Sequence, residues 1–380
     1  MTMIDRDIES QVREMFLNGN KAVIIKGPRQ SGKTTLVRKI CHPVSDNLLY
    51  YTGDDMTHRE LLSGMSILRW KDCLGSKKHV FIDEAQKIPN IGDAAKMLVD
   101  NFDDVHLIMT GSSSFELMNV SGEALTGRKR EWTLLPLSFN ELSNASSVAE
   151  ERMSLESRLV YGSYPEVVVS SDKRDAIEEI AESYLLRDVL AVDGVRKSQT
   201  FLKLLNALAL QIGNEFSLNE LSGLVGINKD TVSKYISILE QSYIIFTLGS
   251  YSSNRRTELK KSRKAFFYDC GIRNAVLSDF TDFRLRSGDE KGALFENYLI
   301  SERIKLNNSS RRKAKCYFWR TTTQSEVDYI ELYDGKMEAF EFKFNPKRAA
   351  VFSRGFKSAY PDAVTSTTTS ENFESFLRTS

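Results

Sequence analysis

Eight residues near the N-terminus have the types and spacing of a phosphate-binding loop. The stretch GPRQSGKT, residues 27–34, fits the pattern GxxxxGK[ST] and lies between a short apolar run and a helical stretch. Glycines let backbone N–H groups wrap a phosphate, and the following helix adds its positive N-terminus. Lys33 is placed to reach the β- and γ-phosphates, and the Thr34 hydroxyl to hold Mg²⁺. We therefore expect ATP and Mg²⁺ as cofactors, bound by Gly27, Pro28, Arg29, Gln30, Ser31, Gly32, Lys33, Thr34 and Thr35.

A pair of acids follows the apolar run HVFID at residues 79–83. Asp83 ends that run and Glu84 comes next. Because α/β sheets bind ligands at the carboxyl ends of their strands, Asp83 is expected to orient Mg²⁺ together with Thr34. Glu84 is placed to polarise the water that attacks the γ-phosphate. Such a pair is also a common solvated end of a strand, but its place about 50 residues after the phosphate loop favours catalysis.

A second group of charged residues lies in SEVDYIELYDGKMEAFEFK, residues 325–343. Asp328 begins one β-like run, while Glu341 and Lys343 alternate with phenylalanines on the next and so face one side. Glu296 lies upstream in the amphipathic helix GALFENYLISERI. Carboxylates with a lysine can bind Mg²⁺ and activate water. The same residues also suit an ordinary hairpin whose charges pair across strands.

The elements around the phosphate loop predict an α/β fold with a parallel sheet. Continuous apolar runs separated by helical stretches indicate strands buried on both faces. The expected strands are residues 22–26, 48–52, 79–83, 105–110 and 132–137. Residues 150–200 are expected to be helical, and later strands are expected at CYFWR, EVDYIEL and MEAFEFKF.

Residues 217–240 have helix-turn-helix patterning. Ser217 with Glu220 makes a capping box, and Asn228 is a good cap for a second helix. The residues expected to face a groove are Asn228, Lys229, Thr231, Ser233 and Lys234. The following stretch suits a wing with a basic surface from Arg255, Arg256, Lys260, Lys261, Arg263 and Lys264. Such domains bind DNA or serve as protein-contact modules, and both interpretations stay open.

Composition limits the classes of partner. Among 380 residues, 52 basic and 51 acidic side chains nearly cancel, so nucleic-acid binding must come from local patches. The N-terminus is charged, unlike a signal peptide, and no run approaches the roughly 18 apolar residues of a membrane span. Four scattered cysteines suggest free thiols. We expect a cytoplasmic protein with no membrane partner.

Several of these stretches occur together, and in the same order, in a known family. GPRQSGKTT, FIDEAQKIPN, MTGSSS, LTGRKREWTLLPLSFNEL and YGSYPEV resemble a group of prokaryotic AAA+ ATPases across essentially the whole chain. That group carries a C-terminal domain of unknown function that is similar to the PD-(D/E)XK nuclease fold. The resemblance implies four domains: an ATPase core (1–145), a helical lid (146–200), a winged-helix-like domain (201–265) and a nuclease-like domain (266–380).

The resemblance also implies roles for further residues. Thr110 or Ser112 would sense the γ-phosphate. Arg128 is the first choice, and Arg187 the second, for the arginine that compensates γ-phosphate charge, often from a neighbouring subunit in an oligomer. Surface salt bridges are the alternative for both arginines.

For the C-terminal domain the resemblance implies a possible second site, formed by Glu296, Asp328, Glu341 and Lys343. In the nuclease family, equivalent acids bind Mg²⁺ and the lysine helps to activate water. Domains with this fold can also keep these charges without cutting nucleic acid.

Two functions follow as hypotheses. The first is an ATP-hydrolysing, Mg²⁺-dependent AAA+ enzyme that couples nucleotide state to the binding or processing of DNA or another nucleic acid. The second is an ATP-dependent switch that binds a protein partner and has a catalytically silent C-terminal domain.

Overall fold

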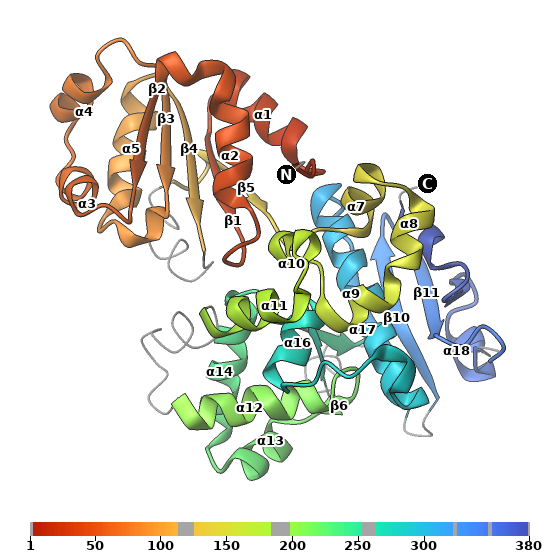
Figure 1. The fold of residues 1–380 in the computed structure, drawn as a ribbon. Coiled ribbons are helices and arrows are strands. Elements are labelled where there is room, and N and C mark those ends of the chain that lie inside the picture. The colour runs from red at the N-terminus through yellow and green to blue at the C-terminus, as the bar shows by residue number, and fades with distance from the viewer. Residues whose placement is uncertain are drawn as a thin grey trace. The chain divides into compact units, whose positions relative to one another are not determined.

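The computed structural model describes residues 3–112, 125–183, 198–252, 263–321, 325–348 and 352–378. The chain divides into two compact units (Figure 1). Unit 1 comprises residues 1–135 with 241–243, and unit 2 comprises residues 136–240 with 244–380. Unit 2 therefore contains the segments predicted as lid, winged helix and nuclease-like domain.

Unit 1 is built on a five-stranded parallel sheet with the order β2-β3-β4-β1-β5. Its strands are β1 (Ala22–Lys26), β2 (Leu48–Thr52), β3 (His79–Asp83), β4 (His106–Gly111) and β5 (Lys129–Thr133). The first three have the predicted bounds, and the fourth is shifted by one residue. These apolar runs form strands because helices cover the sheet and both faces of each central strand are buried (Figure 1).

The prediction for the fifth strand was wrong in its position. We expected residues 132–137, but β5 ends at Thr133. β5 is an edge strand that pairs with β1 alone in this sheet, so polar Lys129 and Glu131 fit there and form an ion pair of 2.8 Å. Leu134 is buried and its N–H still donates to the Lys26 carbonyl oxygen at 2.7 Å, but the register with β1 ends at Thr133 and the chain turns away before Pro136. The apolar run at residues 132–137 therefore indicated residues that pack in the core, and not the bounds of the strand.

The helices of unit 1 lie before β1 or between successive strands of the sheet. They are α1 (Glu9–Asn18), α2 (Lys33–Cys41), α3 (Met56–Ser63), α4 (Ile67–Leu74) and α5 (Ile91–Asn101), with 3₁₀ turns η1 (His42–Asn47) and η2 (Ala85–Lys87). α2 begins directly after the phosphate loop, as the sequence predicts. Two apolar clusters, one on each side of the sheet, make up the core of the unit.

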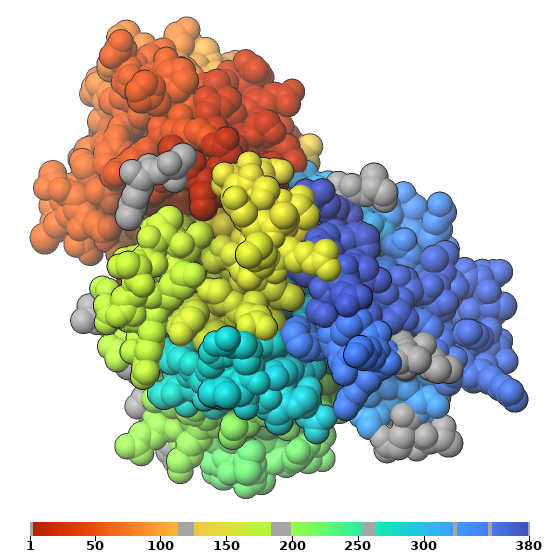
Figure 2. All heavy atoms as spheres, turned by 45° about the vertical axis from the view of Figure 1, so that its right-hand side comes forward, coloured from red at the N-terminus to blue at the C-terminus, as the bar shows by residue number. Residues whose placement is uncertain are grey.

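The helices of unit 2 contribute to one large apolar core, apart from the helix at residues 354–359, which belongs to a smaller cluster with Trp319 and Ile330. They are α7 (Phe139–Ala145), α8 (Val148–Met153), α9 (Leu155–Tyr161), α10 (Pro165–Val169), α11 (Lys173–Ala181), α12 (Ser198–Leu210), α13 (Leu218–Val225), α14 (Lys229–Gln241), α16 (Cys270–Val276), α17 (Gly288–Ser309) and α18 (Arg354–Ala359), with 3₁₀ turns η4 (Phe283–Leu285) and η5 (Phe373–Ser375). Figure 2 shows the yellow segment around α7 and α8 packed against the blue C-terminal segment. Phe139 and Phe373 meet edge to face at 5.5 Å, and Arg152 pairs with Glu374 at 3.3 Å.

A seven-stranded mixed sheet runs through unit 2 in the order β12-β11-β10-β9-β7-β8-β6. Its strands are β6 (Glu215–Phe216), β7 (Ile245–Ser250), β8 (Arg263–Phe267), β9 (Lys315–Arg320), β10 (Glu326–Tyr333), β11 (Lys336–Lys343) and β12 (Val364–Thr369). β7 pairs with β8 on one side and with β9 on the other. The predicted boundary between residues 265 and 266 thus falls inside a strand of one continuous sheet.

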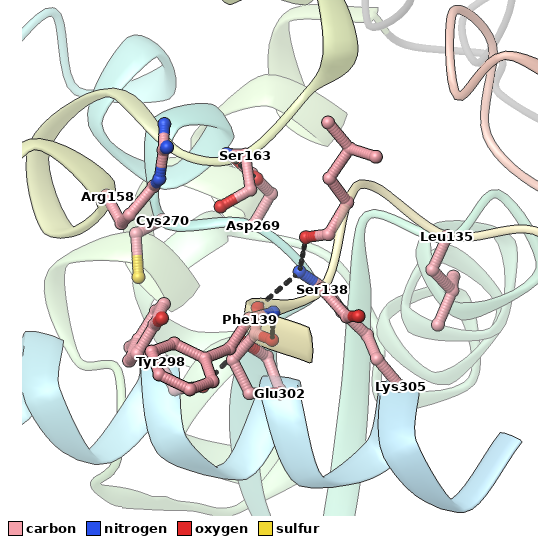
Figure 3. A network of polar contacts seen from close by, with 12 residues as sticks. Leu135, Ser138, Phe139, Arg158, Ser163, Asp269, Cys270, Tyr298, Glu302 and Lys305 are labelled. Atoms are coloured by element: carbon pink, nitrogen blue, oxygen red, sulfur yellow. Dashed lines mark hydrogen bonds and ion pairs between the residues drawn. The ribbon is translucent and has the colours of Figure 1, made fainter. Parts of the chain in front are cut away.

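Two charged residues of α17 anchor the segment that follows β5 (Figure 3). Glu302 accepts a hydrogen bond of 2.7 Å from the Phe139 N–H and pairs with Lys305 at 2.6 Å. Lys305 in turn donates to the Leu137 carbonyl oxygen at 3.1 Å. Both side chains are buried, so each polar group is satisfied by its partner, as buried charges require. None of the described helices is both long and apolar enough to cross a bilayer.

Candidate functional site

The phosphate loop between β1 and α2 has the backbone shape that phosphate binding requires. Gly32 has φ +91° and caps α2, a conformation that residues with a Cβ rarely adopt. A Cβ at Gly27 would overlap the carbonyl oxygen of Leu134, so glycine is required there by close packing. The loop therefore presents its backbone at the N-terminus of a helix, where anions are stabilised.

Lys33 is turned toward its own loop. Its side chain is 5% exposed, and Nζ donates to the carbonyl oxygens of Gly27 at 3.0 Å and Pro28 at 2.6 Å. Burial lowers the pKa of Lys33 to about 8, because the charged form is poorly solvated and the nearby acids compensate only in part. Lys33 is thus a buried cation that has no direct carboxylate partner among the described residues.

Asp83, Thr34 and Thr110 meet beside the loop. Asp83 Oδ1 accepts a hydrogen bond from Thr34 Oγ1 at 3.0 Å and another from Thr110 Oγ1. The residues lie at the carboxyl end of β3, next to the start of α2. Mg²⁺ prefers such oxygen ligands and keeps several waters. The side chains of Thr34 and Asp83 therefore fit a magnesium ion bound with ATP. The sequence predicted all three residues.

Glu84 is held by a residue that the sequence analysis did not single out. Gln86 Nε2 donates to Glu84 Oε2 at 2.7 Å and to Ser112 Oγ at 2.8 Å. Glu84 has φ +49°, an uncommon backbone conformation that directs the residue out of the strand. Gln86 therefore links the candidate base to the end of β4. A glutamine two residues after an acidic pair gave no signal strong enough to predict this.

Arg6 is a second residue that sequence reasoning missed. Its guanidinium donates to the carbonyl oxygens of Ser31 at 2.7 Å and Leu135 at 2.6 Å. It thereby ties the phosphate loop to the chain that leaves β5. Ser31 lies 25 positions from Arg6 in the sequence and Leu135 lies 129 positions from it, so no local pattern could predict these contacts.

Arg128 does not join this site within the chain. It precedes β5, whose first residue pairs with Ala22 at the start of β1, whereas the loop follows the end of that strand. A five-residue strand spans about 16 Å, so Arg128 lies at the opposite edge of the sheet. There it pairs with Asp100 and its side chain is 46% exposed. Its role as an arginine finger remains a prediction that needs a neighbouring subunit. Arg187 lies outside the described residues.

The four predicted residues of the second site come together in unit 2. Lys343 Nζ lies 2.9 Å from Glu341 Oε2 and 3.5 Å from Asp328 Oδ2. Asp328 also accepts a hydrogen bond of 2.8 Å from the Phe342 N–H. β10 carries one extra residue against β9 between Val327 and Ile330, a bulge of the kind that re-aims a side chain. Glu296, Asp328 and Lys343 line a pocket of about 970 Å³.

Lys264 and Glu326 belong to the same cluster and were not predicted as site residues. Lys264 Nζ pairs with Glu296 at 3.3 Å and also with Glu326. We expected Lys264 to contribute to a basic surface, but its side chain is 3% exposed, so that expectation was wrong. The reason is the β7–β8 ladder, which turns this position toward the acids of α17 and β10. We define the acidic–lysine cluster as Lys264, Glu296, Glu326, Asp328, Glu341 and Lys343.

Crowding of like charges perturbs the acids of the acidic–lysine cluster. Burial raises the pKa of Glu296 to about 8, and Asp328 and Glu326 add to the shift while Lys264 opposes it. Burial followed by Asp328 raises the pKa of Glu341 to about 7. Burial alone would lower the pKa of Lys343, but Asp328 and Glu341 hold it above its usual value. Burial and crowding thus raise the pKa values of Glu296 and Glu341 well above the usual range of a glutamate.

The arrangement of the cluster does not fit a bound divalent metal ion. Within the described parts of the chain, no group of three or more His, Cys, Asp or Glu side chains is arranged to hold a metal. Ammonium groups stand between the carboxylates instead: Lys264 between Glu296 and Glu326, and Lys343 between Asp328 and Glu341.

The predicted helix-turn-helix segment forms α13 and α14. The capping box of Ser217 and Glu220 is present, and Asn228 Oδ1 accepts a hydrogen bond of 2.8 Å from the Thr231 N–H. Of the residues expected to face a groove, Thr231 is half-buried and the others are exposed. The wing residues Arg255, Arg256, Lys260 and Lys261 lie outside the described residues.

Comparisons with known proteins assign the first part of the chain. Residues 19–143 match a family described as AAA domain. Residues 152–282 and 291–375 match two families described as domains of unknown function, DUF8612 and DUF4143.

The relatives found by sequence are uncharacterised proteins. One from Mycobacterium tuberculosis is 28% identical over 370 residues, covering 94% of this chain and 77% of its own. One from Haemophilus influenzae is 25% identical and covers 78% and 76%. Among solved structures, the Thermotoga maritima RuvB Holliday junction branch migration motor aligns with 16% identity and a TM-score of 0.33, over 68% of this chain and 95% of that one. Residues 19–143 are thus similar to an AAA domain, and the following residues match families of unknown function.

Proposed function

We propose that unit 1 hydrolyses ATP with Mg²⁺ bound by Thr34 and Asp83. The observation that supports this most is the meeting of Thr34, Asp83 and Thr110 beside a glycine loop at the N-terminus of α2. Mg²⁺ would neutralise charge on the β- and γ-phosphates.

The protein side chains supply the remaining steps. Lys33 exchanges its bonds to the loop carbonyls for bonds to the β- and γ-phosphates, which restore its charge. Glu84 leaves Gln86 and orients the attacking water. Thr110 or Ser112 lies near enough to Asp83 or Glu84 to report the state of the γ-phosphate.

The test is phosphate release by Lys33→Ala. We expect turnover to fall at least about a hundredfold, because the charge on the transferring phosphoryl group loses its main protein cation. Lys71→Ala, at an exposed position on α4, is the matched control and should keep full turnover. Full turnover by Lys33→Ala would overturn the proposal.

The second part of the proposal is that unit 2 couples this cycle to nucleic acid. Support comes from the helix-turn-helix geometry of α13 and α14 and from the exposed Lys229 and Lys234. Duplex DNA should then stimulate ATP turnover, and the logarithm of its affinity should fall linearly with that of salt concentration. Absence of any salt slope would remove the nucleic-acid role.

Processing of nucleic acid at the acidic–lysine cluster is a weaker extension of this proposal. It is supported by the contacts of Lys343 with Asp328 and Glu341 beside a pocket that Asp328 and Lys343 line, but not by the fit to a metal. The test is incubation of DNA and RNA with Mg²⁺ or Mn²⁺. Cleavage that survives in both Asp328→Ala and Lys343→Ala would come from contamination.

A protein-binding switch is the second candidate function. Leu210 at the end of α12 is 70% exposed and Leu224 on α13 is 68% exposed, and these two helices pack together. Exposed leucines of this kind are more typical of protein contacts than of a DNA-facing surface. This function predicts ATP turnover that DNA leaves unchanged, which separates it from the first.

A further inference from the structure

We propose that Lys264 is a built-in cation that occupies the acidic–lysine cluster in place of a divalent metal ion. The inference concerns the acidic–lysine cluster, argues against metal-dependent processing of nucleic acid there, and is independent of ATP hydrolysis. It assigns a role to a residue of β8 that lies far in sequence from the acids it meets.

The position of Lys264 is that of a counter-ion rather than a surface charge. Its side chain is 3% exposed, and its ammonium group contacts carboxylates from two different elements, Glu296 of α17 and Glu326 of β10. The Nζ atom also lies 5.3 Å from the centre of the Phe318 ring, whose face attracts cations. An ammonium buried this deeply requires such compensation.

The carboxylates around Lys264 are the ligands that a hard divalent cation would use. Glu296 and Asp328 belong to the predicted metal site and line the same pocket. Glu341 lies beyond Asp328 and is joined to it through Lys343. A metal ion within reach of Glu296 and Asp328 would lie a few ångströms from the Lys264 ammonium, and like charges at that separation repel strongly in a buried site.

The fixed backbone keeps Lys264 in place. β8 pairs with β7 through Leu248 opposite Lys264, and with β6 through Glu215 opposite the same residue. The backbone is therefore held from both sides, and the side chain enters the cluster from a strand interior. Arg320 adds a second positive group 3.7 Å from Glu326. The cluster is thus supplied with cations by the protein itself, and we infer that the native chain leaves no place for Mg²⁺ or Mn²⁺ there.

The experiment measures Mn²⁺ binding by electron paramagnetic resonance on the full chain without nucleotide. Native protein should show no Mn²⁺ binding that depends on Asp328. Lys264→Met should bind Mn²⁺ at least about tenfold more tightly than native protein, because removing the ammonium removes the repulsion. Adding Asp328→Asn to that variant should abolish the gain. Lys264→Arg, which keeps the charge, and Lys336→Met, at an exposed position on β11, should behave like native protein.

A second measurement, of thermal unfolding with and without Mn²⁺, remains informative if Lys264→Met is less stable than native protein. Mn²⁺ should raise the Tm of Lys264→Met but not that of Lys264→Arg, since ligands that bind the folded state stabilise it. The double variant Lys264→Met/Glu326→Gln also removes one of the two carboxylates that pair with Lys264. It should show the same rise of Tm with Mn²⁺. The proposal is overturned if native protein binds Mn²⁺ through Asp328 as tightly as Lys264→Met does. It is equally overturned if neither Lys264→Met nor Lys264→Met/Glu326→Gln gains an Mn²⁺ site that depends on Asp328. Nucleic-acid cleavage is scored separately, so failure of the processing proposal would leave the Mn²⁺ result unaffected.

Discussion

Each unit of the chain buries a lysine, and the two lysines have opposite surroundings. Lys33 in unit 1 donates to backbone carbonyls and has no direct carboxylate partner in the part of the chain that the structure describes, so burial lowers its pKa. Lys264 in unit 2 pairs with two carboxylates, which outweigh the effect of burial and raise its pKa. The first lysine belongs to a site that gains charge compensation when an anion binds. The second belongs to a site that is already compensated.

The largest expected effect separates the two lysines by stability. Lys264→Met should destabilise the fold by about 3 kcal/mol, because it leaves buried carboxylates without their cation. Lys33→Met should leave the free energy of unfolding unchanged or raise it by about 1–2 kcal/mol, since the cost of a poorly compensated charge disappears. Denaturant unfolding of the nucleotide-free protein measures both. Equal losses in the two variants would remove the distinction drawn between the sites.

A smaller effect should appear in the pH dependence contributed by Glu296. Its folded pKa of about 8 lies above the unfolded value of 4.5, so the favourable contribution is complete below pH 4.5 and is lost as pH rises toward 8. Glutamine has no such proton to lose, so Glu296→Gln does not lose stability in this way. The free energy of unfolding of Glu296→Gln minus that of native protein should therefore be about 1–3 kcal/mol higher at pH 8 than at pH 5. The groups that face Glu296 are Lys264, Glu326 and Asp328.

Urea unfolding at the two pH values provides the measurement for Glu296→Gln. Glu338→Gln is the control, because that acid lies on β11 and pairs with Arg312 at 3.0 Å, outside the cluster. A constant difference between Glu296→Gln and native protein across this range would contradict the expected protonation of Glu296.

The smallest effect is a proton taken up when ATP binds. Free Lys33 loses its proton above pH 8, whereas phosphates beside it return its pKa toward the usual 10.5. ATP binding at pH 8.5–9 should therefore take up a fraction of a proton, and the contribution of Lys33 should vanish near pH 6.5. Calorimetry in buffers of different ionisation enthalpy detects this. Lys33→Arg keeps its charge throughout and should show no such uptake, so equal uptake by both proteins would exclude Lys33 as the source.

The sequence predicted most of the residues that the structure brings together beside the phosphate loop, because the signals for them are local. Loop, strand ends and helix start fall within short stretches, and in a parallel sheet the ends of neighbouring strands meet at one edge. Asp83 was therefore expected beside the loop, together with Thr110 or Ser112, and the structure places Thr34 and Thr110 against Asp83. The position of Arg128 was harder to predict, because its distance from the loop depends on which end of β5 faces the loop. We also predicted β5 at the wrong residues, because the apolar run after it packs in the core.

The acidic–lysine cluster was predicted only in part for a related reason. Asp328, Glu341 and Lys343 lie on one hairpin, where spacing is informative. Lys264 and Glu326 meet across strands separated by about 60 residues, through a sheet whose order no local pattern specifies. A lysine in a basic stretch is ordinarily a surface residue, and we predicted Lys264 to be exposed on that ground. The prediction was wrong because the carboxylates of Glu296 and Glu326 compensate its charge in the interior.

The continuous sheet of unit 2 has a consequence for how such chains evolve. Recombination that exchanged the part after residue 282 would separate β9 from β7, although the two lie side by side. It would also separate Lys264 on β8 from the acids that it neutralises on α17 and β10. The helix-turn-helix part and the C-terminal part therefore have to be inherited together, and substitutions at Lys264 should be accompanied by compensating changes at Glu296 or Glu326.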